Sequence, residues 1–85
     1  MIEFNHTVKD PNGIHARPAG LLVKEVARFQ SEVTLQKGGK YANGKGLFSL
    51  LSLSVKSGET VTVTVSGSDE REAADAIKAY MIENL

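Results

Sequence analysis

The strongest constraint on the fold is the seven-residue segment Thr60–Ser66, in which valine alternates with threonine or serine. Successive side chains of a β-strand point to opposite faces, so every valine of this segment lies on one face and every threonine on the other. Such a strand belongs to a sheet that has one buried apolar face and one wet face, as antiparallel sheets commonly do. The sequence therefore predicts a sheet that is covered on one side only.

The rest of the chain divides into segments with the period of a strand or of a helix. Alternating apolar residues, and a glycine pair at 38–39 suited to a tight hairpin, predict three more strands at residues 2–8, 32–36 and 40–42. Apolar residues at helical spacing predict three helices, over residues 16–29, over a short segment that ends near Leu53, and over a last segment capped by Ser68 or Asp69. The resulting order, βαββαβα, predicts an α+β domain.

Length and composition set further limits. The chain has 85 residues, with 10 Lys and Arg against 10 Asp and Glu, and no cysteine. One domain over residues 1–85 is predicted, because a chain of this length builds one core. Zero formal net charge excludes the basic surplus that a nonspecific nucleic-acid binder or a membrane-surface protein would use. Since no apolar segment is long enough for a signal peptide or a membrane span, we expect a cytoplasmic protein that does not insert into membranes.

The segment Gly13–Gly20, with the sequence GIHARPAG, places a histidine where a loop becomes the first predicted helix. Pro18 is tolerated in a first helical turn, where amides have no intrahelical acceptor. The amides of Ala16 and Arg17 are then free to bind an anion, and the Arg17 guanidinium suits phosphate oxygens. The neutral imidazole of His15 is a nucleophile near pH 7. These residues predict a phosphoryl site, with His15 and Arg17 as catalytic residues; the alternative is a polar helix cap beside a surface arginine.

Two other chemical signals are set aside. Residues 39–46 match seven of the eight positions of a phosphate-binding loop, but Gly46 replaces the Ser or Thr that would hold magnesium. His6 and His15 have no cysteine beside them, and a strand and a loop separate them, so no metal site is predicted. His6 is instead expected near the packed face of the sheet. No cofactor is predicted.

The motif Gly13–Ala19 resembles the active-site signature of HPr, the histidine-containing phosphocarrier family of the phosphoenolpyruvate-dependent sugar phosphotransferase system. Similar residues recur along the whole chain, at Lys45, Leu47, Ser52, Leu53 and 67–70. The resemblance implies an open-faced β-sandwich, with a four-stranded antiparallel sheet and three helices on one face. It also implies that Nδ1 of His15 accepts a phosphoryl group from phosphorylated enzyme I and passes it to the A domains of sugar-specific enzymes II.

The same resemblance implies that these partners dock on an apolar surface beside the site. Its candidates in this chain are Gly20, Lys24, Leu47, Phe48 and Leu51. Helical spacing alone would place Leu47 and Leu51 in the core. Phe48 lies off that stripe and is the better anchor for an interface. Lys24, at the rim, would steer the protein toward acidic partner surfaces.

The chain departs from the family pattern at two positions near the short helix. Many members have a serine at the start of this helix that a regulatory kinase phosphorylates, whereas this chain has Gly46, so no regulatory serine is predicted. The family usually ends the helix with a glycine, whereas this chain has Ser54, for which a left-handed backbone costs more.

The sequence thus predicts a monomeric phosphocarrier, which relays a phosphoryl group but is not a self-sufficient enzyme. Two alternatives stay open. One is a regulatory binding module that uses the Phe48 surface without carrying phosphate. The other is a carrier of a nitrogen-related or fructose-specific branch, with the same chemistry at His15 and different docking residues.

Overall fold

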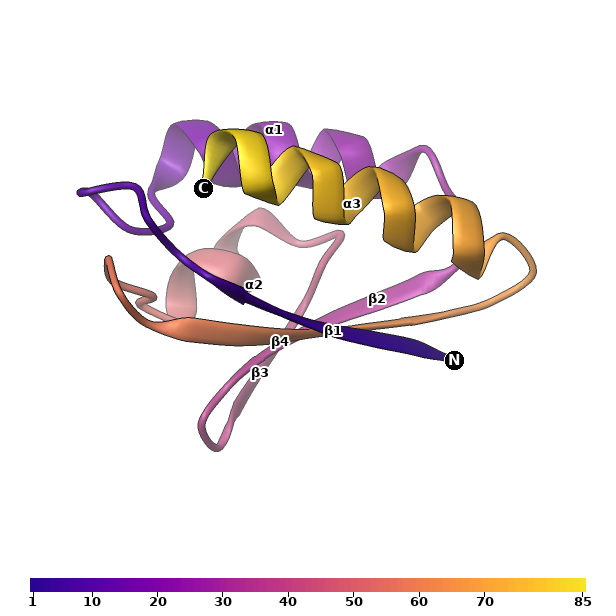
Figure 1. The fold of residues 1–85 in the computed structure, drawn as a ribbon, viewed down its shortest axis with the longest axis horizontal. Coiled ribbons are helices and arrows are strands. Elements are labelled where there is room, and N and C mark those ends of the chain that lie inside the picture. The colour runs from indigo at the N-terminus through magenta and orange to yellow at the C-terminus, as the bar shows by residue number, and fades with distance from the viewer.

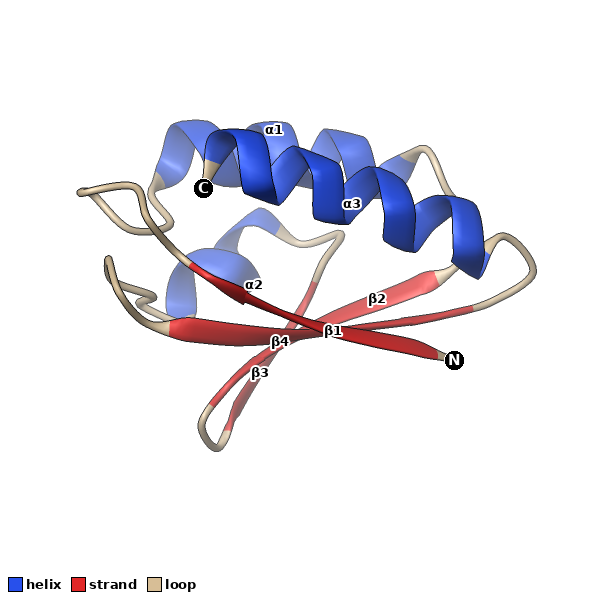
Figure 2. Ribbon diagram, in the orientation of Figure 1, coloured by secondary structure: helices blue, strands red, loops and turns tan.

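The computed structural model describes residues 1–85, which form a four-stranded sheet with three helices on one of its sides (Figure 1). The strands are β1 (Ile2–Thr7), β2 (Glu32–Lys37), β3 (Lys40–Asn43) and β4 (Thr60–Ser66). The helices are α1 (Ala16–Ala27), α2 (Leu47–Ser52) and α3 (Glu70–Asn84). The strands lie in the order β1-β4-β2-β3, and all neighbours are antiparallel. The predicted α+β order and the one-sided sheet are confirmed, and the other face is left open (Figure 2).

The strand with the clearest alternation, β4, lies between β1 and β2. Its three valines are fully buried, whereas its threonines are exposed or half-buried. Val63 pairs with Phe4 of β1 on one side and with Leu35 of β2 on the other. The register therefore brings apolar side chains from three strands to the helix-covered face of the sheet.

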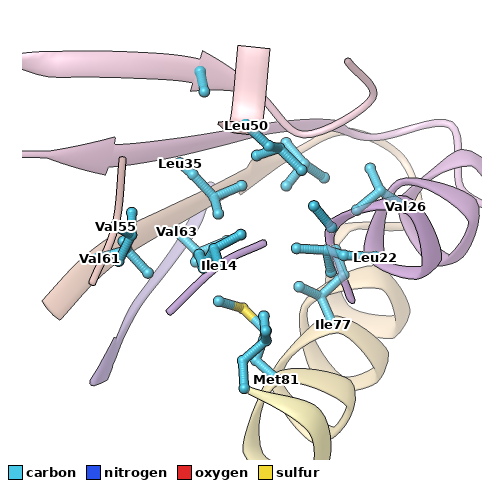
Figure 3. Packing of buried hydrophobic residues seen from close by; sticks show 14 of the residues in the cluster. Ile14, Leu22, Val26, Leu35, Leu50, Val55, Val61, Val63, Ile77 and Met81 are labelled. Atoms are coloured by element: carbon cyan, nitrogen blue, oxygen red, sulfur yellow. The ribbon is translucent and has the colours of Figure 1, made fainter. Parts of the chain in front are cut away.

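The core lies between this face and the helices (Figure 3). The predicted stripe of the last helix is buried in full, at Ala73, Ala74, Ile77, Met81 and Leu85. The first helix ends at Ala27, earlier than the predicted end at residue 29. The amides of Arg28 and Phe29 bond to the carbonyls three residues earlier, at 3.2 and 3.1 Å, and this tighter turn closes the helix. Phe29 still packs against the core.

Asp69 precedes α3 as predicted, but its carboxylate does not cap that helix. It accepts hydrogen bonds from the amides of Gln30 and Ser31, at 2.9 Å each, and from the Ser31 hydroxyl at 2.5 Å. These donors hold the pKa of the Asp69 carboxyl below its usual value, with the hydroxyl as the largest cause. Ser31 is fully buried, so its polar groups need a partner more than the exposed end of α3 does. The expected side-chain cap of α3 by Asp69 is therefore wrong.

His6 lies half-buried on β1, and its Nε2 atom is buried without a hydrogen-bond partner. Burial lowers the pKa of the imidazole below 6.5, and the nearby charge of Lys9 acts in the same direction. Just below pH 6.5 the unfolded chain therefore binds a proton that the folded chain does not. The stability that His6 contributes is complete above pH 6.5 and is lost as the pH falls.

We expect the free energy of unfolding, measured by urea titration, to decrease between about pH 7 and pH 5.5, where histidine titrates. The decrease should be smaller in His6→Gln, because glutamine carries no charge at either pH. Equal decreases in the two proteins would contradict the assignment to His6.

Candidate functional site

The candidate site begins with a turn that only glycine can make. Gly13 has φ +66°, and a Cβ atom at this position would lie 2.2 Å from the carbonyl oxygen of Val55. The Gly13 amide donates to the Asp10 carbonyl at 2.9 Å, which closes the turn. The next amide, that of Ile14, donates to the same Val55 oxygen at 3.0 Å. Gly13 therefore lets the backbone approach Val55 closely enough for this bond to form.

Residues 8–15, which we call the His15 loop, are anchored at both ends on residues 54–59, which we call the supporting segment. At the first end, the Val8 amide donates to the Glu59 carbonyl at 2.9 Å, and the Gly58 amide donates to the Val8 carbonyl at 2.7 Å. At the second end, Ile14 and Val55 are both buried in the core cluster (Figure 3). The position of His15 therefore depends on the supporting segment, about 40 residues further along the chain.

His15 occupies the N-cap position of α1, but its side chain makes no capping hydrogen bond. The side chain is 41% exposed, and its Nε2 atom lies 3.5 Å from Oδ2 of Asp10. The helix start is held by backbone instead, since the Ala19 amide donates to the His15 carbonyl at 3.0 Å. The imidazole is thus not used as a cap, and it is free to react.

The first turn of α1 presents unpaired donors beside the imidazole. The amides of Ala16 and Arg17 have no acceptor within the chain, and Pro18 has no N–H group. The Arg17 side chain is exposed and forms no ion pair. Two free amides, the positive end of the helix dipole and a free guanidinium together favour an anion at this place.

The C-terminal part of α3 supports the first turn of α1 and the His15 loop. The Tyr80 hydroxyl of α3 donates to the Pro18 carbonyl at 3.1 Å, and burial raises the pKa of this phenol above its usual value. The Leu85 carbonyl accepts the amides of Lys9 and Asp10, at 2.6 and 3.1 Å. Figure 1 shows the C-terminus beside the start of α1. The His15 loop is therefore held by α3 as well as by the supporting segment.

The candidate docking residues lie on α1 and α2, which pack against each other. Phe48 is 84% exposed, and Lys24 is also exposed. Gly20 is half-buried. Leu47 and Leu51 are half-buried and pack against the core, so each has both a packed side and an accessible side. The helical spacing of these leucines correctly indicates contact with the core, but full burial is reached by Leu50 alone among the three leucines of α2.

Leu21 is a further exposed apolar residue on α1, 51% exposed, that the sequence reasoning did not single out. The sequence could have indicated its exposure, because Leu21 follows Gly20 directly and lies off the buried stripe of α1. Asp10 was also missed as a site residue, because the segment Asp10–Gly13 was interpreted only as a turn. Its carboxylate belongs to the site through the contact with His15.

Residues 39–46, which match most positions of a phosphate-binding loop, lead into the start of α2. Gly46 is the N-cap residue and brings no hydroxyl there. The Lys45 ammonium donates to the Phe29 carbonyl at 3.0 Å, so it binds protein backbone.

The structure contains no group of three or more His, Cys, Asp or Glu side chains that could hold a metal ion. No helix is both long and apolar enough to span a membrane.

The end of α2 has the strained backbone expected from the sequence. Ser54 has φ 52° and is the only residue other than glycine with a positive φ. A left-handed conformation costs such a residue on the order of 1 kcal/mol or more. Its carbonyl oxygen accepts a hydrogen bond from Nζ of Lys37, at 2.9 Å.

A one-sided α+β sheet, with a free histidine before a helix whose first amides are unpaired, defines a small domain with an anion-binding helix start. Residues 2–83 match the sequence family described as the PTS HPr component phosphorylation site. The chain therefore belongs to the HPr family of phosphocarrier proteins, which are not themselves enzymes.

Individual relatives agree with this assignment. The chain is 43% identical over 81 residues to the HPr-like protein Crh of Halalkalibacterium halodurans, covering 95% of this chain and 96% of that protein. It is 41% identical over 85 residues to the phosphocarrier protein HPr of Mycoplasma genitalium, covering 99% and 97%. A solved Mycoplasma histidine-containing phosphocarrier protein superimposes with a TM-score of 0.93 at 34% identity, covering 96% and 93%. The open-faced sheet implied by the sequence resemblance is thereby confirmed.

Proposed function

We propose that this protein relays a phosphoryl group from phosphorylated enzyme I, through His15, to the A domains of sugar-specific enzymes II. The observation that carries the proposal is the free imidazole of His15 beside the unpaired amides of Ala16 and Arg17. An acceptor of this kind needs a nucleophile and a place for three phosphoryl oxygens, and both are present within three consecutive residues. Residues 1–85 act in this role as one domain.

The transfer uses the two ring nitrogens of His15 differently. Because the Asp10 carboxylate lies on the Nε2 side at 3.5 Å, it favours the tautomer with the proton on Nε2 and the lone pair on Nδ1. The Nδ1 lone pair attacks phosphorus, so the N–P bond forms while the bond between phosphorus and enzyme I breaks and the donor atom keeps the electron pair. The free amides and Arg17 offset the charge on the phosphoryl oxygens. The reverse sequence delivers the group to the next acceptor.

The relay is tested in two stages by intact-mass measurement. Incubation with enzyme I and phosphoenolpyruvate should add one phosphoryl group to this protein. After enzyme I is removed, addition of an enzyme II A domain should move that group to the A domain. A phosphorylated protein that keeps its phosphoryl group with every A domain of a panel would contradict the relay, and differences in rate within the panel would distinguish a general carrier from a branch-specific one.

The docking surface supplies a prediction of its own. Phe48→Ala should raise the concentration of enzyme I needed for the half-maximal rate by about tenfold, since exposed aromatic anchors contribute on this scale to protein interfaces. Its free energy of unfolding should change by less than about 0.5 kcal/mol, because Phe48 is 84% exposed. Tyr41→Ala on β3, where the ring is 66% exposed, is the matched control and should leave the rate unchanged. Equal behaviour of the two variants would exclude Phe48 as an anchor.

The Phe48 surface is proposed to include Gly20, Leu21, Leu47 and Leu51, with Lys24 at its rim. The half-buried leucines support this extension because they offer apolar surface next to Phe48 without leaving the core. Lys24 contributes a positive charge, whose effect on the association rate should weaken as salt is added.

A regulatory role is the second candidate, favoured by the similarity to Crh. A relative of that name from Bacillus subtilis, 41% identical, is described as a catabolite repression protein and as a swapped, intertwined dimer. A protein that acts only by binding should keep its biological effect in His15→Ala, whereas a relay should lose it.

For the present chain we propose a monomer in the cytoplasm. A mass of two chains in light scattering would contradict the monomer.

A further inference from the structure

Resting on the proposed function, we propose that Lys37 is a positioning residue for His15, although it belongs to a different element and lies outside the phosphoryl-site motif. Lys37 is the last residue of β2. Its ammonium donates to the Ser54 carbonyl at 2.9 Å and pairs with Oε1 of Glu59 at 3.0 Å. Ser54 and Glu59 are the first and last residues of the supporting segment, so one side chain ties both of its ends to the sheet.

The contacts of Glu59 show how this pair fixes the backbone. The same Oε1 atom accepts the Lys56 amide at 2.7 Å, and the Glu59 amide donates to the Lys56 carbonyl at 3.0 Å. The Lys56 amide and the Lys37 ammonium hold the pKa of the Glu59 carboxyl below its usual value, with the amide as the larger cause. The carboxylate of Glu59 therefore joins the turn at Lys56 to the end of β2.

The link from this pair to His15 runs through two short steps. Val55 follows Ser54 directly, and its carbonyl oxygen accepts the Ile14 amide at 3.0 Å. His15 follows Ile14. At the other end, Glu59 itself accepts the Val8 amide through its carbonyl. One end of the His15 loop is therefore bonded to Glu59, which Lys37 contacts. The other end is bonded to Val55, which follows the Lys37 contact Ser54.

The strained backbone at Ser54 makes this support necessary. A residue other than glycine keeps a positive φ only where its surroundings hold it there. The Lys37 ammonium is the side-chain donor that holds the Ser54 carbonyl, and the Lys37 side chain is 25% exposed. Without it, Ser54 can relax toward an ordinary conformation, and the Val55 carbonyl moves with it.

The test compares Lys37→Met, which is one heavy atom shorter and removes the charge, with Lys37→Arg, which keeps a donor. Lys40→Met is the matched control, because Lys40 lies at the start of β3, is exposed and makes no side-chain hydrogen bond or ion pair. All proteins are measured well below their melting temperatures. The readouts are the single-turnover rate of phosphoryl transfer from saturating phosphorylated enzyme I, and hydrogen exchange at the Ile14 amide.

Lys37→Met should lower the saturated transfer rate by about fivefold, since small displacements of a reacting group reduce rates strongly. It should also speed hydrogen exchange at the Ile14 amide. Lys37→Arg should keep the transfer rate and the exchange rate near those of the wild type, and Lys40→Met should change neither rate. Should Lys37→Met fail to fold, Glu59→Gln is measured instead and should show a smaller loss in the same direction. A variant that melts earlier but transfers at the wild-type saturated rate would overturn the proposal, because that result describes a purely structural residue.

The wild-type protein separates this inference from the relay itself. If the wild type accepts no phosphoryl group from active enzyme I, the proposed function fails. If the wild type is phosphorylated and Lys37→Met reaches the same rate, only the positioning role of Lys37 fails.

Discussion

His15→Ala is expected to remain folded and to accept no phosphoryl group from enzyme I. The side chain is 41% exposed and makes no capping hydrogen bond, so its removal should change the free energy of unfolding by less than about 0.5 kcal/mol. The chemical loss should be complete, because His15 is the proposed nucleophile beside the unpaired amides of Ala16 and Arg17. Intact mass after incubation with enzyme I and phosphoenolpyruvate provides the measurement.

His6→Ala is the control for this experiment, since His6 is the only other histidine and lies half-buried on β1. It should gain one phosphoryl group as the wild type does. A phosphorylated His15→Ala would show that another residue is the acceptor. Unfolding of His15→Ala would instead assign His15 a structural role at the start of α1.

Gly13→Ala is expected to have the largest effect on stability among the substitutions near the site. The new methyl group would have to occupy a position 2.2 Å from the Val55 oxygen, on a backbone at φ +66°. We expect a loss of about 2 to 4 kcal/mol in the free energy of unfolding, from overpacking and from the left-handed conformation. The Ile14 bond to Val55 should be lost as well, so the transfer rate should fall even where the protein is folded.

Two glycines of the β2–β3 hairpin separate these two causes, because a Cβ atom at either position would meet no atom within 4 Å. Gly38 has φ +59°, so Gly38→Ala should lose only the conformational contribution, about 1 kcal/mol. Gly39 has no positive φ, so Gly39→Ala should lose less. The order Gly13, Gly38, Gly39 is expected in chemical denaturation. Equal losses at Gly13 and Gly38 would show that the approach to Val55 has no energetic importance.

Local periodicity predicted the elements of this fold because the residues of each buried face recur at a regular spacing within one short segment. The alternation in Thr60–Ser66 and the helical stripe from Ala73 to Leu85 both appear as buried faces in the structure. Local reasoning failed where a distant partner competed. Asp69 follows the sequence rule for a helix cap, yet its carboxylate binds Ser31, because a buried amide and hydroxyl gain more from it than an exposed helix end does.

The sequence predicted the chemical groups of the candidate site, but not the contacts that hold the His15 loop in position. The residue types from His15 to Pro18 are sufficient to expect a nucleophile and free amides at a helix start. The roles of the Val55 carbonyl and of Lys37 depend on contacts between segments far apart in the sequence, and no periodicity encodes such contacts. Ser54 is an intermediate case, since its departure from the family glycine predicted the strain but not the lysine that holds it.

The most direct test of the account is a nitrogen-15 NMR spectrum of the imidazole rings, recorded before and after phosphorylation by enzyme I and again after acid treatment. The account predicts one phosphoryl group on Nδ1 of His15, an unchanged His6 ring, and return of the original spectrum after acid, because a phosphoryl group on nitrogen leaves readily. A phosphoryl group on Nε2, on His6 or on an acid-stable hydroxyl would contradict it. An unmodified spectrum, obtained with enzyme I that phosphorylates an HPr relative, would contradict the central claim outright.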